Sequence, residues 1–211
     1  MKKIFKMLLM VMLTFIFSIC FKSQVNAVIY PAYGQYKLTW NIESIYYYVD
    51  SSAENYSSVI SSAANNWVYT GLGYNKLWPN TRIYDVLGTA IDIYAYNGSV
   101  NGIEATTSLY KWVNSVKTEV PWVGVSGRSN TGIPSGDYKF AEILINSSQI
   151  SSNSSYYTNT RFQGIVAHEF GHCWGIGHNP ENVNSLMHNY SDNRSNTVQQ
   201  VDQNVFNILY P

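Results

Sequence analysis

The motif that most constrains this chain of 211 residues is His-Glu-x-x-His-x-x-Gly-x-x-His, which begins at His168. Side chains four positions apart lie one above the other on a helix, so the motif predicts a helix that presents His168 and His172 on one face. Gly175 can adopt the left-handed backbone conformation that ends a helix. The chain can then turn, and His178 can approach the other two histidines.

This arrangement predicts a zinc site. Three histidine ligands leave a fourth coordination position for water, which is typical of catalytic rather than structural zinc. Glu169 would lie beside the metal without binding it, where a general base is needed. All four histidines of the chain, His188 included, fall in this one region. We therefore expect one catalytic zinc ion bound by His168, His172 and His178.

The N-terminus has the pattern of a secretory signal peptide. A basic start precedes the apolar stretch Met7–Phe21, which is short for a membrane span, and small residues precede a cleavage site after Ala27. We expect residues 1–27 to be removed and residues 28–211 to form one secreted domain without stable membrane insertion. An uncleaved anchor and a lipoprotein at Cys20 are the alternatives.

Composition excludes one class of partner. The chain has 13 basic and 13 acidic residues, but four lysines lie in the predicted signal peptide, so the mature chain is near −4. This charge is not that of a nucleic-acid-binding protein. Cys20 leaves with the signal peptide, so Cys173 would have no partner for an intramolecular disulfide. We expect Cys173 to be a buried, small apolar residue.

The order of periodic segments predicts an α+β domain. An amphipathic helix is expected around Ile60, a metal-binding helix starts from a capping box at Thr160 and Gln163, and a last helix starts from Thr197 and Gln200. Two polar stretches predict loops, Gly124–Gly136 and Asn146–Asn159. The expected strands are Ile45–Val49, Ala90–Tyr96, Gly102–Thr107 and Phe140–Ile145.

The chain resembles the metzincin clan of zinc peptidases, and within it the matrixins. The resemblance is carried by the long histidine motif, by Ser185-Leu186-Met187 after it, by the closing helix that ends at Tyr210, and by Gly102–Ala105. It implies a twisted, mostly parallel sheet with an antiparallel edge strand, an active-site helix, a Met-turn and a C-terminal helix. Met187 would be the Met-turn residue beneath the zinc.

The resemblance also implies an activity, that of a zinc metalloendopeptidase. Glu169 would serve as general base and later as acid, and the enzyme would act as a monomer on an extended polypeptide. The substrate would pair with the edge strand, and the segment Pro180–Asn196 would wall the pocket for the residue after the scissile bond. The expected pairing residues are Ile103, Glu104, Ala105 and Thr106.

Several positions depart from the patterns of related branches. Asn179 follows the third histidine where astacins have Glu and reprolysins have Asp, and Tyr190 stands one place beyond the astacin tyrosine. We expect Tyr190 to be structural and His188 to be a loop residue rather than a fourth ligand. We expect no cysteine-switch propeptide and no second, structural zinc. Acidic residues are scattered, so calcium binding is not supported.

Two other functions fit parts of the sequence. A secreted binding module could use zinc only to hold its fold, but it would need no acid at Glu169. A zinc hydrolase could act on a substrate other than a peptide, although an edge strand beside the site favours an extended polypeptide.

Overall fold

The computed structural model describes residues 35–42, 45–70, 81–83, 88–124, 132–192 and 194–211, with only the backbone described for 81–83. All of them belong to one compact unit, Pro31–Pro211. The predicted signal peptide and its cleavage site lie outside the described residues. In the described ranges, no helix is both long enough and apolar enough to cross a membrane.

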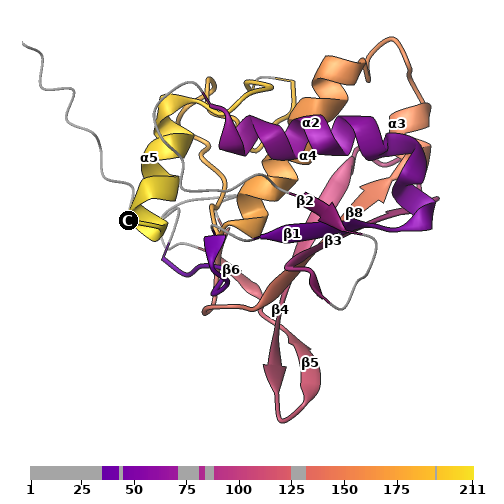
Figure 1. Cartoon of the computed structure of the whole chain (residues 1–211). Helices are drawn as coiled ribbons and strands as arrows, with labels where there is room; N and C mark the ends of the chain where they lie inside the picture. The colour runs from indigo at the N-terminus through magenta and orange to yellow at the C-terminus, as the bar shows by residue number, and fades with distance from the viewer. Residues whose placement is uncertain (1–34, 43–44, 71–80, 84–87, 125–131, 193) are drawn as a thin grey trace, which may run out of the picture. The chain divides into compact units, whose positions relative to one another are not determined.

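A six-stranded sheet organises this unit, in the order β2-β1-β3-β8-β4-β5 (Figure 1). The first four strands in that order are parallel, β4 runs antiparallel to β8, and β5 extends β4 as a hairpin. This confirms the predicted mostly parallel sheet with an antiparallel strand at its edge. The bounds are β1 Tyr46–Val49, β2 Thr81–Ile83, β3 Ile91–Tyr96, β4 Ala105–Val113, β5 Val116–Glu119 and β8 Phe140–Asn146.

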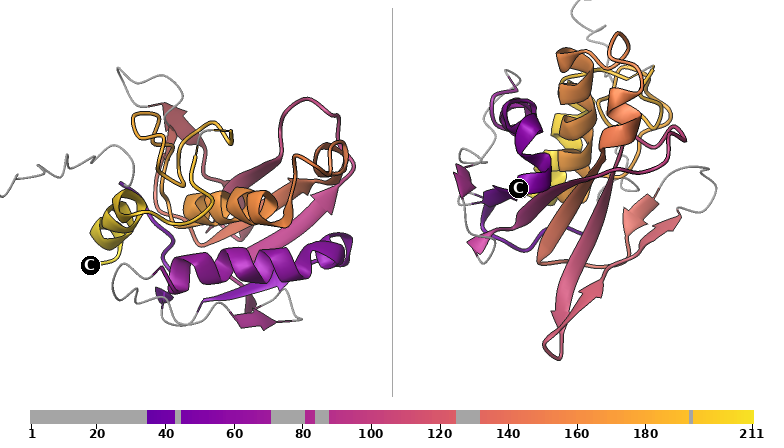
Figure 2. Two further views of the ribbon diagram at one scale, coloured as in Figure 1. Left: turned by 90° about the horizontal axis from the view of Figure 1, so that it is seen from above. Right: turned by 90° about the vertical axis from the view of Figure 1, so that its right-hand side faces the viewer.

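Two helices lie side by side over one face of the sheet, as Figures 1 and 2 show. They are α2 (Ser57–Val68), which follows the 3-10 helix η2 (Ser51–Tyr56), and α4 (Asn159–Cys173). The indole N–H of Trp67 on α2 donates a hydrogen bond of 2.8 Å to the carbonyl of Ala167 on α4. This bond satisfies a polar group that would otherwise be costly to bury between the helices.

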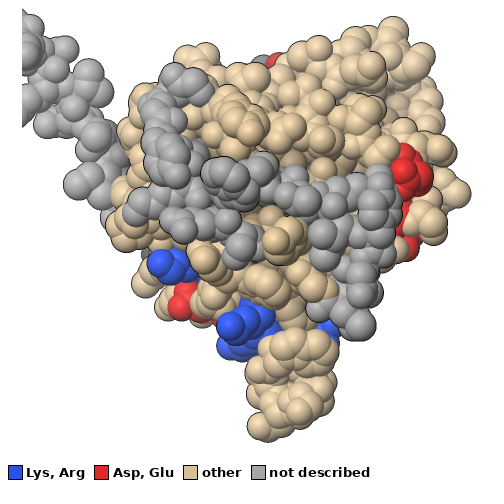
Figure 3. All heavy atoms as spheres, in the orientation of Figure 1, with Lys and Arg blue, Asp and Glu red and all other residues tan. Residues whose placement is uncertain are grey.

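The core forms where the sheet meets these helices. Ile91 and Ile93 on β3 and Ile143 on β8 are fully buried, and Phe170 of α4 meets the ring of Tyr47 edge-on at 6.1 Å. Burying each large apolar side chain contributes about 1.5–3 kcal/mol, which holds α4 firmly against the sheet. The face of the molecule seen in Figure 3 shows few charged side chains among the described residues.

The helix starts differ from those predicted. The hydroxyl of Thr158 accepts from the backbone of Arg161 and caps α4, so Thr160 already lies inside the helix. The last helix, α5 (Gln200–Leu209), starts at a capping box between Gln199 and Asp202 rather than at Thr197. In both cases the observed cap lies two residues from the predicted one.

The predicted loops contain short elements. The segment Asn146–Asn159 includes α3 (Ser147–Ser151), and Gly124–Gly136 begins at the last residue of β6 (Trp122–Gly124) and contains β7 (Gly132–Pro134), which pairs with β6. Residues 125–131 lie outside the described residues. The predicted edge strand Gly102–Thr107 begins only at Ala105, because Gly102 has a φ of +87°, which is not an extended conformation.

Candidate metal centre

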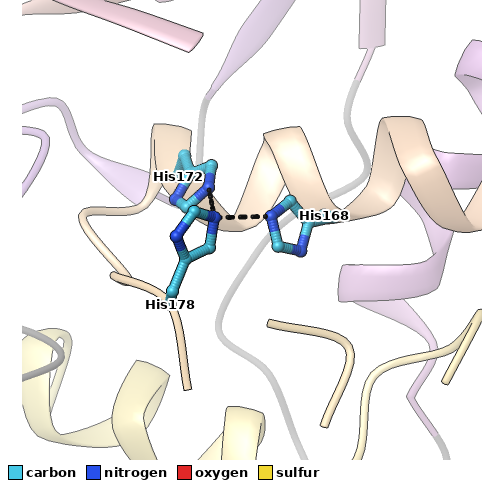
Figure 4. Close-up of side chains that lie close together, drawn as sticks. All are labelled: His168, His172 and His178. Atoms are coloured by element: carbon cyan, nitrogen blue, oxygen red, sulfur yellow. Dashed lines mark hydrogen bonds between the residues drawn. The ribbon is translucent and has the colours of Figure 1, made fainter. Parts of the chain in front are cut away.

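Three histidine side chains converge at the end of α4 (Figure 4). His168 and His172 leave the same side of the helix, and the chain then turns at Gly175, whose φ is +87°. The turn brings His178 back, so that its Nε2 lies 3.2 Å from the Nε2 of His172 and 3.2 Å from that of His168. The structure thus brings together the three residues that the motif predicts as ligands.

The geometry of the nitrogens fits zinc. Zn–N bonds of about 2.0–2.1 Å in a tetrahedron place neighbouring nitrogens about 3.3–3.4 Å apart, close to the 3.2 Å found here. The Nδ1 atoms of His168 and His172 lie 2.8 Å from the carbonyl oxygens of Leu186 and Ile176. A proton on each Nδ1 leaves the Nε2 lone pairs free to bind a metal.

Burial keeps these imidazoles neutral, as metal binding requires. Desolvation lowers the pKa of His172 to about 4, although its hydrogen bond to Ile176 opposes the shift. Desolvation also lowers the pKa of His168 well below its ordinary value, helped by the charge of Arg194. The two helix ligands are therefore ready to bind zinc across the neutral pH range.

We expect the metal-free protein to lose stability as the pH falls from 6.5 towards 4. The unfolded chain protonates His172 near its ordinary pKa of 6.5, but the folded chain does so only at about 4. The unfolded state thus binds more protons in this window, and acidification lowers the free energy of unfolding by about 3 kcal/mol from His172 alone. Urea unfolding of chelator-treated protein at pH 7, 6 and 5 measures this; a free energy that stays constant would contradict it.

Glu169 lies next to the histidines on α4 and is buried. The hydroxyl of Thr107 on β4 lies 2.7 Å from its Oε2 and donates to it. Desolvation raises the pKa of Glu169, and the hydrogen bond from Thr107 partly offsets that rise. One carboxylate oxygen is therefore held in place by β4.

The predicted Met-turn residue lies directly under the helix. Met187 is fully buried, and its thioether packs against Gly171, between the two helix ligands, where a Cβ would overlap it. The backbone N–H of Asn179 donates to the carbonyl of Met187 at 2.7 Å. Because the preceding carbonyl, that of Leu186, holds His168, the turn also fixes the orientation of a ligand.

A buried carboxylate from α5 holds this turn. Asp202 accepts hydrogen bonds from the backbone N–H groups of Leu186 and Met187, at 2.9 and 3.4 Å, and from the hydroxyl of Ser185. Burial raises the pKa of Asp202, and these hydrogen bonds oppose the rise. The C-terminal helix therefore contributes to the site by fixing the turn beneath it.

A cleft of about 270 Å³ opens beside the histidines. Of the four residues expected to pair with substrate, Ala105 and Thr106 line it, whereas Ile103 and Glu104 do not. None of the described residues of 180–196 lines this cleft, and the expectation that the segment walls the pocket after the scissile bond stays a prediction. The lining residues are Ala105, Thr106, Thr107, Trp122, Gly132, Glu169, His172 and His178.

Polar contacts join the 180–196 segment to Glu104, just before β4, and to the start of α4. The hydroxyl of Ser191 donates to Glu104 at 3.1 Å, and Asp192 pairs with Arg161 near the start of α4 at 2.6 Å. His188 is buried and accepts a 3.2 Å hydrogen bond from the backbone of Tyr190, which is itself 58% exposed. Neither His188 nor Tyr190 lines the cleft.

Cys173 is buried and free, as predicted. It ends α4 directly behind the site, and burial raises the pKa of its thiol well above the ordinary value. Its carbonyl accepts a 2.8 Å hydrogen bond from the hydroxyl of Tyr138. A neutral, buried thiol fits the role of a small apolar packing residue.

We expect Gly177→Ala to weaken zinc binding. A Cβ at this position would overlap the carbonyl oxygen of Gly132 on β7, so the backbone just before His178 would have to move. The expected loss is about 10–100-fold in zinc affinity, as for changes that disturb the orientation of a ligand. Competition with a coloured chelator measures the affinity. Gly136→Ala is the matched control, because no neighbour lies within 4 Å of a Cβ there; equal affinities for the two variants would contradict the prediction.

Three contributors to the site were not predicted from the sequence. Thr107 was placed in the edge strand without a role, and the side-chain alternation of that strand could have pointed it towards Glu169. Asp202 stands in the first turn of α5, where a carboxylate is common, and nothing local indicates its bond to the Met-turn. The place of Trp122 beside Thr107 depends on the register of the β4–β5 hairpin, because β6 follows β5 in the chain. No motif in the sequence indicates that register.

Comparison with known proteins adds one finding. A family model described as matrixin, of peptidase family M10, matches residues 109–211, which include the three histidines and the turn at Met187. No curated protein matches the chain.

Proposed function

Since this chain is matrixin-like over residues 109–211, we propose that it is a secreted, zinc-dependent metalloendopeptidase with Glu169 as its general base. The observation that carries the proposal is the cluster of three histidine nitrogens, all within 4.8 Å of one another, beside a buried glutamate and the part of β4 that precedes its pairing with β5. His168, His172 and His178 would hold the zinc, which when bound supplies a Lewis acid that polarises the peptide carbonyl.

In the proposed mechanism the protein's own residues move the protons. The carboxylate of Glu169 removes a proton from the attacking water as the water oxygen bonds to the carbonyl carbon of the scissile peptide bond. The same carboxyl group then delivers that proton to the amine as the C–N bond breaks. Thr107 holds one oxygen of the carboxylate at 2.7 Å, which orients the group for both transfers.

The edge of β4 would orient the substrate. In the ladder between β4 and β8, the carbonyls of Glu104 and Tyr110 accept from β8 or the residue just before it. Because the direction alternates along a strand, the backbone groups of Ala105 and Thr107 point away from β8, into the cleft. An extended peptide pairing with these groups would lie alongside Glu169 and the histidines.

The buried glutamate also argues against a purely structural zinc. Burying an ionisable carboxyl group costs free energy. Glu169 is not among the three clustered metal-binding residues, so metal binding does not offset that cost. A zinc-stabilised binding module has no need of it, whereas a hydrolase does. This alternative therefore explains fewer of the residues around the cleft.

The experiment that tests the function uses the purified, zinc-loaded protein on denatured casein. We expect fragments whose new termini, identified by mass spectrometry, lie inside the casein sequence. A protein that binds zinc and leaves casein and a broad peptide mixture intact would overturn the proposal and favour the binding module.

We also propose that residues 1–27 are a signal peptide and that residues 28–211 are the exported domain. The proposal rests on the basic start and the short apolar stretch of the sequence. N-terminal sequencing of the protein from the culture medium should find Val28 as the first residue. Retention of Met1 on a cell-associated protein would contradict it.

A further inference from the structure

The open edge of β4 is shorter than the strand itself. Beyond Tyr110 its outer side pairs with β5, and the carbonyl of Leu109 accepts a 2.7 Å hydrogen bond from the backbone of Val120. The carbonyl of Thr107 accepts a long hydrogen bond, 3.4 Å, from the indole N–H of Trp122. The outward-facing backbone groups with which a substrate could still pair are therefore the N–H and C=O of Ala105 and the N–H of Thr107.

Trp122 stands where this open edge ends. Its ring meets the ring of His172 edge-on, with centroids 5.1 Å apart, and it lines the cleft together with Gly132. A residue of an extended chain rises about 3.3 Å, so a substrate side chain beside the indole lies within one or two residues of the bond held at the histidines.

The strand that carries the indole has defined neighbours. Its own strand, β6, pairs with β7 through Trp122 and Pro134, and a Cβ added at Gly132 of β7 would lie 3.6 Å from the Cβ of Trp122. The carbonyl of Gly132 in turn packs against Gly177, next to the ligand His178. Trp122 therefore contacts the outer edge of β4 and the ring of His172. Its partner strand β7 packs against the loop that carries His178.

We propose that Trp122 is a specificity-determining residue that ends substrate pairing at Thr107 and selects an aromatic or large aliphatic substrate side chain next to the scissile bond. Because the indole N–H is turned to Thr107, the ring presents apolar surface to the cleft. Glu169 is the one acidic residue among the lining residues, and no Lys or Arg is among them to attract an acidic side chain. This inference rests on the proposed function and adds its substrate class.

The test compares wild-type protein with Trp122→Phe, Trp122→Ala and Trp112→Ala on a diverse peptide mixture, with cleavage sites identified by mass spectrometry. Trp112 is a matched control, because it is a 60% exposed tryptophan on β4 that does not line the cleft. We expect wild type and Trp112→Ala to share a preference for aromatic or large aliphatic residues at one position near the cut. Trp122→Phe should keep that preference, and Trp122→Ala should lose it.

Kinetics on a matched pair of peptides give the size of the effect. With the preferred aromatic residue, Trp122→Ala should lower kcat/KM about three- to tenfold, while the peptide with alanine at that position is cleaved almost equally by both proteins. Zinc content should stay at the wild-type level. An equal fall for both peptides, or an unchanged preference in Trp122→Ala, would overturn the inference.

Binding separates this inference from the proposed function. Calorimetry on zinc-loaded Glu169→Gln protein, with and without Trp122→Ala, measures affinity for the same aromatic and alanine peptides without cleavage. If wild type cleaves nothing but the aromatic peptide binds more tightly and loses that advantage in Trp122→Ala, the subsite stands although the peptidase proposal fails. If neither peptide binds and none is cleaved, both are overturned.

Discussion

Glu169→Gln should lower kcat by about 10²–10⁴-fold while the protein still binds one zinc ion. An amide cannot take a proton from water at neutral pH, and general acid–base catalysis contributes a factor of this size. The change is nearly isosteric, and glutamine can still accept a hydrogen bond from Thr107, so the fold and the ligands should be undisturbed. Casein cleavage rates and zinc content of the two proteins measure the effect.

Glu119→Gln is the control for this substitution. Glu119 is exposed on β5 and does not line the cleft, so its loss should leave the rate unchanged. If Glu169→Gln cleaved casein at the wild-type rate, another group would have to be the base, and the role assigned to Glu169 would be wrong.

His172→Ala should abolish activity and lower zinc affinity by more than about a hundredfold. Changes to residues that only orient a ligand cost about 10–100-fold, and removal of a ligand itself must cost more. The substitution also removes the 5.1 Å ring contact with Trp122. Zinc titration with a competing chelator measures the affinity, and casein cleavage measures the activity.

His188→Ala provides the matched comparison. His188 is buried like the two helix ligands His168 and His172, yet it is outside the cluster of three and contacts Tyr190 instead. We expect this variant to bind one zinc ion with near wild-type affinity. Loss of zinc from His188→Ala as well would mean that His188 takes part in binding the metal.

The parts of the fold that could be predicted from the sequence are those governed by short-range spacing. The i, i+4 pair His168 and His172 predicts a helix, and only a residue that tolerates positive φ, as Gly175 does, allows His178 to return. The apolar alternation of Ile91 and Ile93 likewise predicted a half-buried strand, which is β3. In these cases a local rule and the tertiary structure agree.

The parts that could not be predicted depend on residues far apart in the chain. Asp202 caps α5, but it also binds Leu186 sixteen residues earlier, and no local pattern indicates that contact. Trp122 reaches Thr107 because the β4–β5 hairpin brings the segment after β5 alongside β4. The capping box predicted at Thr160 was wrong for a local reason instead, because the hydroxyl of Thr158, two residues earlier, caps α4.

The central claim is that one zinc ion at His168, His172 and His178 makes this protein a peptidase, and a zinc titration tests it most directly. Metal-free protein would be loaded stepwise with zinc, and casein cleavage would be measured at every step. We expect activity that rises in proportion to zinc and stops rising at one ion per chain. Full activity without zinc, or one tightly bound zinc with no cleavage of casein or of a broad peptide mixture, would contradict it.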